Sequence, residues 1–205
     1  MNFYTGPFHH KRKQVIDYIK EQKAKGKFTA IDIGGEADSW ATEVSDMIID
    51  IKPLGLDKAM TVDICRADDV NRVLDYIRQN GKFDYAICSH TLEDVYNPYL
   101  MLDKLPEIAN KGIIFVPTCY TEMSKAVSDA EWLGYIHHRY MYKELDGRIL
   151  VMAKMPFLER RYNFGVIEQE LGVEWEGKID YIDIYDAFPY WDVKTMIEAY
   201  EKALT

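Results

Sequence analysis

The sequence has little cysteine, no long apolar run and no basic stripe, and each shortage excludes a class of protein. Its three cysteines, Cys65, Cys88 and Cys119, are too few and too scattered for a disulfide framework. Nothing approaches the run of about 18 apolar residues that a membrane span requires. The first residues lack the apolar stretch of a secretory signal. We therefore expect a cytoplasmic protein without a membrane span.

Positive charge is also in short supply. The chain carries 25 Lys and Arg against 34 Asp and Glu, a net charge of −9. Tight binding to nucleic acid needs a basic surface that neutralises phosphates, so we expect no nucleic-acid partner. The one dense basic cluster, residues 9–13, lies at the start of a predicted helix, where it opposes the helix dipole. It is either a solvated face or a face turned toward an anion.

The order of apolar patterns predicts a doubly wound α/β fold. With 205 residues, 48% of them hydrophobic, the chain is long enough for one sizeable core. Nearly continuous apolar runs alternate with helical patterns, as in a parallel sheet covered on both faces. The strands are expected at about 28–33, 47–51, 60–64, 83–88 and 112–117, and the helices at about 9–25, 37–45, 67–80, 97–110 and 121–133. Pro53 and Gly55 make the 50–60 connection a loop.

The pattern changes in the last third of the chain. Residues 139–155 read as two strands around an Asp146-Gly147 turn, a strong hairpin signal, and we expect this hairpin to close the sheet. The segment 178–185 resembles a strand and 191–204 a helix. We divide the chain into a cofactor-binding domain at 1–155 and a C-terminal extension, 156–205, packed on the same domain.

The most informative motif is Asp32-Ile-Gly-Gly35, read together with Asp50 at the end of the next predicted strand. Glycine has no Cβ, so a backbone turn made of glycine can approach a bound molecule closely. An acid that follows the next strand is placed to accept hydrogen bonds from both hydroxyls of a ribose. Together they predict an adenosine-containing cofactor.

These residues resemble a class I S-adenosylmethionine-dependent methyltransferase over roughly residues 28–155. The resemblance rests on Asp32–Gly35, Asp50, 62–64, 83–94 and the hairpin. More narrowly, 89–94 followed by 134–140 is similar to small methyltransferases associated with bacterial glycan and surface-polysaccharide assembly. The usual third glycine is missing, because Glu36, Ala37 and Asp38 follow Gly35.

The resemblance implies a mostly parallel, seven-stranded, Rossmann-like sheet with a closing antiparallel hairpin, and S-adenosyl-L-methionine as cofactor. It implies a binding role for Asp32, Gly34 and Gly35 beneath the methionine moiety, Asp50 at the ribose, Asp63 and the Ile64 backbone at the adenine, and Ser89 with His90 beneath the sulfonium. Two plainer interpretations stay open: the glycine pair as an ordinary tight turn, and Asp63 as a cap of the helix that begins near residue 67.

The five histidines all lie in motif-like places: His9, His10, His90, His137 and His138. Methyl transfer to a hydroxyl needs a base near the oxygen, and the ordinary pKa of histidine suits that role. His90, His137 and His138 are therefore candidate catalytic residues. On a strand, the adjacent pair would point to opposite faces, so we expect only one of them to enter the pocket.

Three further residues are candidates for binding the acceptor: Glu93, Asp94 and Arg139. The carboxylates suit sugar hydroxyls, and the guanidinium suits a phosphate or carboxylate. A metal held by His90, Asp94 and one of the paired histidines is conceivable. No H-x-x-x-H or C-x-x-C spacing supports it, so no metal is expected. The same polar residues also fit a structural network that holds the hairpin to the sheet.

The sequence therefore predicts transfer of a methyl group from S-adenosylmethionine to a small polar acceptor. A sugar, nucleotide-sugar or phosphorylated metabolite of glycan assembly is favoured, with oxygen preferred over nitrogen. Two alternatives remain: a nicotinamide-dependent oxidoreductase, and a methyltransferase-like binding protein without activity. NADH and S-adenosylhomocysteine binding distinguish the first alternative. The sequence does not determine the oligomeric state.

Overall fold

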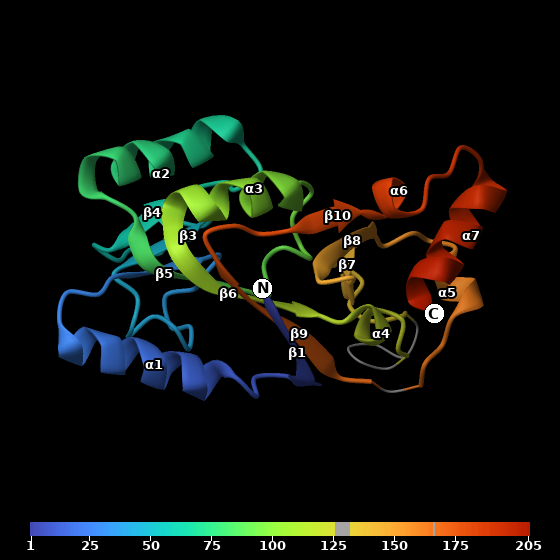
Figure 1. Ribbon diagram of the computed structural model, residues 1–205, viewed down its shortest axis with the longest axis horizontal. Helices are drawn as coiled ribbons and strands as arrows, with labels where there is room; N and C mark the ends of the chain where they lie inside the picture. The colour runs from blue at the N-terminus through green and yellow to red at the C-terminus, as the bar shows by residue number, and fades with distance from the viewer. Residues whose placement is uncertain (126–131, 166) are drawn as a thin grey trace.

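The computed structural model describes residues 1–125, 132–165 and 167–205 (Figure 1). Its larger sheet has seven strands in the order β1-β9-β6-β5-β2-β3-β4. The strands are β1 (Asn2–Pro7), β2 (Ala30–Ile33), β3 (Met47–Asp50), β4 (Ala59–Thr61), β5 (Phe83–Ser89), β6 (Ala109–Pro117) and β9 (Gln169–Glu176).

This sheet is mostly parallel. Strands β2 to β6 pair in parallel, and β9 pairs antiparallel with both β6 and β1, so β1 runs in the same direction as the parallel strands. The predicted doubly wound, mostly parallel, seven-stranded Rossmann-like sheet is confirmed. The 50–60 connection is a loop, as its proline and glycine predict.

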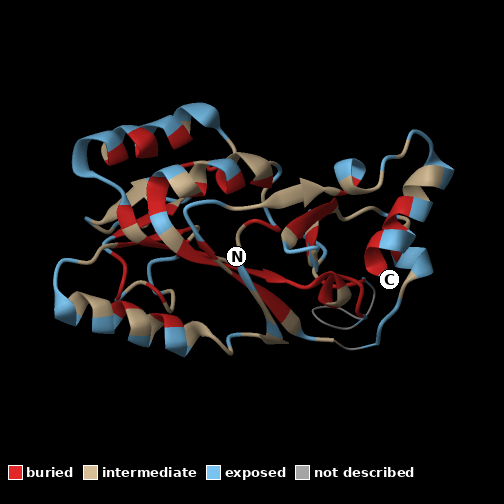
Figure 2. Cartoon of the chain, viewed as in Figure 1, coloured by how far each residue is buried: buried red, intermediate tan, exposed pale blue. Residues whose placement is uncertain are grey.

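Helices cover both faces of this sheet. On one face lies α1 (Arg12–Lys25), which buries Val15 and Ile19. On the other lie α2 (Ala67–Asn80) and α3 (Pro98–Ile108) (Figure 1). The central strands between these layers are buried along most of their length (Figure 2).

The predicted helix at 37–45 is wrong, because the structure has turns there. Short hydroxyl side chains in this segment bond elsewhere: Ser39 Oγ donates to Asp32 Oδ2 at 3.1 Å, and Thr42 Oγ1 donates to the Glu36 carbonyl at 3.0 Å. Such bonds offer the backbone an alternative to helix. Of the predicted helix at 121–133, the structure has the single turn α4 (Cys119–Glu122), and 126–131 lie outside the described residues.

The hairpin around Asp146-Gly147 is confirmed as β7 (Tyr140–Leu145) and β8 (Arg148–Ala153). The expectation that it closes the main sheet is wrong. Strand β9 occupies that position beside β6, while the hairpin forms a second sheet with β10 (Tyr181–Asp183). One face of the hairpin packs in the core of the main sheet, and the other is covered by α7 (Val193–Leu204). Tyr200 of that helix donates to the Ala153 carbonyl at 2.6 Å.

The segment 156–205, expected as an extension packed on the domain, contributes β9, which lies between β1 and β6 in the main sheet, as well as β10 and α7. Two short helices complete it: α5 (Leu158–Arg161) and α6 (Ile184–Ala187). Within the described residues, no helix has the length and apolar character to cross a membrane.

Candidate functional site

The chain reverses its direction across the sheet between β2 and β5. From β2 it proceeds outward through β3 to β4, and then returns to the other side of β2 to form β5 and β6. In open α/β sheets, ligands bind at the carboxyl ends of the strands at such a switch point. Gly34 directly follows the last residue of β2, and Ser89 is the last residue of β5.

The turn after β2 requires both of its glycines. Gly34 has φ +74°, and its N–H donates to the Ile49 carbonyl at 2.7 Å. A Cβ at Gly34 would lie 2.3 Å from Thr91 Oγ1, and one at Gly35 would lie 2.1 Å from Asp32 Oδ2. The glycine pair therefore allows the side chains of Thr91 and Asp32 to pack directly against the turn. An ordinary tight turn would not need a glycine at both positions.

Thr91 ties the two strand ends together. Its hydroxyl lies 3.2 Å from both the Ile33 carbonyl and the Ser89 carbonyl. This fixes the spacing of β2 and β5 at the point where the sheet opens.

Asp32 is a buried carboxyl, only 3% exposed. Burial raises its pKa to about 6, against the hydrogen bond from Ser39 Oγ, and the charge of Asp50 adds to the rise. Asp50 itself is half-buried at the end of β3, and its Oδ1 accepts from the Lys52 N–H at 2.7 Å. Two carboxylates therefore lie at neighbouring strand ends, where they attract a cation.

Asp63 follows β4 on the same edge of the sheet. Its Oδ1 accepts from the Cys65 N–H at 2.9 Å, and the first turn of α2 begins after Arg66 with no side-chain cap. The interpretation of Asp63 as a helix cap is therefore wrong. Ile64 next to it is buried, and Asp69 of α2 accepts from the Asp63 N–H at 3.0 Å, which holds this loop in place.

These residues fit an adenosine cofactor. The hydroxyl of Ser89 is buried and has no hydrogen-bond partner among the described residues, as expected of a group that awaits a ligand. The half-buried Asp50 and Asp63 present carboxylates along the same edge. The structure therefore brings together the predicted cofactor residues at one edge of the sheet.

A cavity of about 560 Å³ opens beside this edge, and four of the five histidines line it. They are His9, His90, His137 and His138, accompanied by Arg12 and Asp94. The expectation that only one of the paired histidines enters the pocket is wrong. Residues 136 and 137 form a turn and 138 and 139 are not part of a strand, so alternation does not apply, and both rings reach the cavity.

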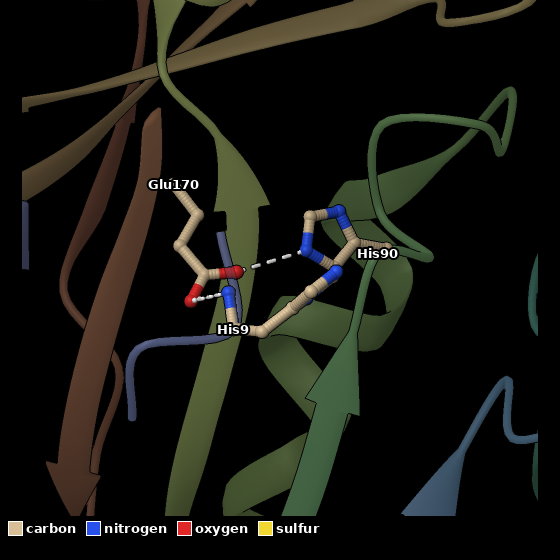
Figure 3. Close-up of side chains that lie close together, drawn as sticks. All are labelled: His9, His90 and Glu170. Atoms are coloured by element: carbon tan, nitrogen blue, oxygen red, sulfur yellow. Dashed lines mark hydrogen bonds and ion pairs between the residues drawn. The ribbon is translucent and has the colours of Figure 1, made fainter. Parts of the chain in front are cut away.

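His90 lies at the end of β5 with φ +52°, a left-handed conformation uncommon for histidine. Its Nε2 lies 3.1 Å from Glu170 Oε2 (Figure 3). Its Nδ1 lies 3.2 Å from Glu93 Oε1. Burial alone would lower the pKa of His90, but the two carboxylates outweigh burial and raise it to about 9. In this arrangement the ring is protonated at neutral pH and has no lone pair with which to accept a proton.

Of the three candidate acceptor-binding residues, only Asp94 lines the cavity. Asp94 is exposed and lines the cavity. Glu93 is completely buried and faces His90, so in this arrangement its carboxylate balances the charge of that ring and does not reach the cavity. Arg139 is exposed outside the cavity lining, and its backbone N–H donates to the Glu93 carbonyl at 2.6 Å.

Sequence reasoning missed several residues of this site. Glu170, buried in β9, accepts from the His9 N–H at 2.9 Å as well as from His90 (Figure 3). Glu122 is also buried, between His138 Nδ1 at 2.7 Å and Lys154 Nζ at 2.8 Å. The sequence carried little signal for Glu170, because β9 also contains Gln169, Glu174 and Glu176, so one more acid in this segment does not stand out.

Comparisons with known proteins find only weak structural similarities. No known family profile matches the chain. No curated protein sequence matches it either. Among solved structures, the chain is similar to the N-terminal domain of EvdMO1 with SAH bound, at 12% identity and a TM-score of 0.38, over 96% of this chain and 72% of that one.

Two other solved structures are similar to a comparable degree. The methyltransferase domain of bacterial CtHen1-C matches at 12% identity and a TM-score of 0.35, over 81% of this chain and 98% of that one. WbdD matches at 11% identity and a TM-score of 0.36, over 56% of this chain, and the match spans only 30% of WbdD. At these TM-scores the likenesses carry no argument about activity, which has to come from the residues of the site.

Proposed function

We propose that this chain is a methyltransferase that uses S-adenosyl-L-methionine and methylates a small polar acceptor. The observation that carries the proposal is the edge of the sheet at the switch point. There a glycine turn, the Asp50 and Asp63 carboxylates and the unpartnered Ser89 hydroxyl lie along three neighbouring strand ends and the loop after β4. This is the set of groups that an adenosine carrying a charged side chain requires.

Each group has a task. Asp50 accepts hydrogen bonds from the ribose hydroxyls, and Asp63 with the Ile64 backbone contacts the adenine edge. Asp32 and Asp50 attract the positive sulfonium, and this attraction is lost when the methyl group leaves, which favours release of the neutral product. His90 does not oppose the sulfonium, because its one positive charge is balanced by the carboxylates of Glu93 and Glu170.

The cavity with the histidines is the proposed acceptor site. Its volume of about 560 Å³ lies within the range of small-molecule sites, roughly 300–1,000 Å³. Asp94 can accept hydrogen bonds from sugar hydroxyls. Arg12 lines the cavity, and its Nε is buried without a hydrogen-bond partner among the described residues, so it suits a phosphate or carboxylate on the acceptor. A sugar, nucleotide-sugar or phosphorylated precursor of glycan assembly fits these groups, with oxygen as the methylated atom.

Calorimetry with S-adenosylhomocysteine tests the cofactor assignment. We expect binding to the unmodified chain, and Asp50→Ala should weaken it by about 1–3 kcal/mol, since ribose hydroxyls then lack their partner. Asp57→Ala, an exposed acid of the same loop, is the matched control and should leave the affinity unchanged. No heat at high concentration of this ligand, or tight binding of NADH in a fluorescence titration, would contradict the proposal.

A further inference from the structure

Three side chains on the rim of the acceptor cavity converge without bonding to one another. Nε2 of His137 and Nε2 of His138 lie 3.7 and 3.6 Å from Oδ1 of Asp94. These distances are too long for hydrogen bonds. They are close to the separation of about 3.4 Å expected between two ligands that each lie about 2.1 Å from one metal ion at a tetrahedral angle. The three ligand atoms all fall within 4.8 Å of one another.

The ring of His138 is held in the orientation that a metal ligand needs. Its Nδ1 lies 2.7 Å from Oε1 of the buried Glu122, so Nδ1–H donates to that carboxylate and the lone pair of Nε2 faces Asp94. Glu122 is held in turn by Lys154 Nζ at 2.8 Å. Metal-binding histidines almost always donate their second ring N–H to a carboxylate or carbonyl in this way.

Lys154 itself is fixed from two further sides. Its ammonium donates to the carbonyls of Leu133 and Tyr135, each at 2.8 Å. These two carbonyls lie just before the turn that presents the paired histidines. Glu122 and Lys154 therefore hold the His138 ring in one orientation. A ring that only packed against its neighbours would not need these polar contacts.

A second cluster in the cavity, His9, His90 and Glu170, lacks this character (Figure 3). There the His90 ring is already hydrogen-bonded to Glu170 at 3.1 Å, and the other oxygen of Glu170 accepts from the His9 N–H at 2.9 Å. The ring nitrogen of His90 and the carboxylate that would bind an ion are therefore already bonded to each other. In the first cluster the ligand atoms are too far apart to bond to one another, which leaves space for an ion, whereas in the second cluster His90 and Glu170 are hydrogen-bonded.

We propose that Asp94, His137 and His138 bind one divalent transition-metal ion, with Glu122 and Lys154 positioning His138. Two imidazoles and one carboxylate favour zinc, iron or manganese over magnesium or calcium. This departs from the absence of a metal expected from sequence spacing. Asp94 and His137 are exposed, with side chains 44% and 64% accessible, so coordination positions on the cavity side remain for solvent or for an acceptor oxygen.

The role of such an ion rests on the proposed function. A metal bound at the rim would lower the pKa of a coordinated hydroxyl, so an acceptor alcohol would lose its proton to solvent more readily before its oxygen takes the methyl group. His90 cannot supply that help while it is protonated. Metal binding itself does not depend on the cofactor, so the two proposals fail separately.

The test uses the full chain freed of metal with a chelator. We expect calorimetry with zinc chloride to show one ion per chain, and cobalt chloride to give the visible absorption bands of a bound ion. Asp94→Asn, at an exposed position, should weaken zinc by at least about 10-fold, and Glu122→Gln by about 10–100-fold. Glu170→Gln is the matched control: it changes another buried glutamate bonded to a histidine of the same cavity, and should alter the zinc affinity less than about 2-fold.

Absence of zinc binding at millimolar concentration would overturn the proposal. So would binding that Glu170→Gln weakens and Asp94→Asn leaves unchanged, because the ion would then occupy the other cluster. His137→Ala, also at an exposed position, provides a second variant that does not disturb the core. Titration of the same metal-free sample with S-adenosylhomocysteine reports separately on the proposed function.

Discussion

The carboxylate of Glu170 lies 3.1 Å from Nε2 of His90, although 80 positions separate the two residues in the chain. The contact crosses from β9 to the end of β5, over the strand β6 that lies between them. It therefore depends on the antiparallel strand that completes the sheet, and it fixes the charge of the ring beneath the proposed methyl-transfer site.

The raised pKa of His90 predicts a loss of stability in alkaline solution. Burial lowers this pKa, but Glu170 and Glu93 raise it from 6.5 to about 9. Because the folded state binds the proton more tightly, the stabilisation is complete below the unfolded value and disappears as the pH rises through about 9. The effect is on the order of 3 kcal/mol. Urea unfolding of the unmodified chain and of His90→Gln measures it.

We expect the difference in unfolding free energy between these two proteins to shrink between pH 7 and pH 10. A difference that stays constant over this range would show that His90 does not hold its proton as described. Glu170→Gln serves as the companion variant, since it should lower the pH at which the ring titrates in an NMR experiment.

The buried carboxyl of Asp32 predicts a compromise between the stability of the chain and binding of the cofactor. Burial raises its pKa from 3.8 to about 6, so the folded chain favours the protonated acid. Its contribution to stability is present below the unfolded value and is lost as the pH rises through about 6. At pH 7.5, Asp32→Asn should therefore stabilise the ligand-free chain by about 1–3 kcal/mol while it weakens the binding of S-adenosylmethionine, whose sulfonium it no longer attracts. Thermal unfolding and calorimetry give the two readouts, and a destabilised variant at that pH would refute the argument.

Gly34 tests whether the turn after β2 is as tight as the structure has it. A Cβ there meets Thr91 Oγ1 at 2.3 Å, whereas Gly177 has a similar φ of +71° and nothing within 4 Å of an added Cβ. Both alanine variants pay the same backbone strain. Gly34→Ala should therefore cost about 1–3 kcal/mol more than Gly177→Ala in urea unfolding. Thr91→Ala in the same chain should recover part of that difference, and equal costs for the two glycines would contradict the clash.

The sequence predicted those features that depend on residues close together in the chain. Helix α2 follows from Val70, Val73, Leu74 and Ile77, whose spacing places them on one face, and all four are buried. The cofactor edge was found in the same way, because Asp32, Gly34 and Gly35 lie within one short turn. Asp50 was identified because it ends the next predicted strand, whereas the role of Ser89 was implied by the resemblance to methyltransferases.

Other features depend on partners far along the chain. Strand β1 has only a short run of strand-forming residues, 3–5, before Gly6 and Pro7. It is stabilised by pairing with β9 in a register that sets Phe3 opposite Val173. The acids behind the histidines were missed for the same reason. Glu122 meets His138 across 16 positions and Lys154 across 32, so spacing in the sequence carries no trace of the arrangement.

Tyr142 provides a test of how the second sheet is attached to the first. Its side chain is 1% exposed, and its hydroxyl donates to the Leu92 carbonyl at 2.8 Å, between the hairpin and the loop that follows β5. Tyr142→Phe keeps the ring but leaves that buried carbonyl without its donor, so we expect a loss of about 1–2 kcal/mol in unfolding free energy. Tyr76→Phe, at a hydroxyl for which the structure has no side-chain hydrogen bond among the described residues, is the matched control and should change little. Because the same loop carries Glu93 and Asp94, the Tyr142 variant should also weaken zinc binding, and a variant as stable as the control would mean that the hairpin is held by apolar packing alone.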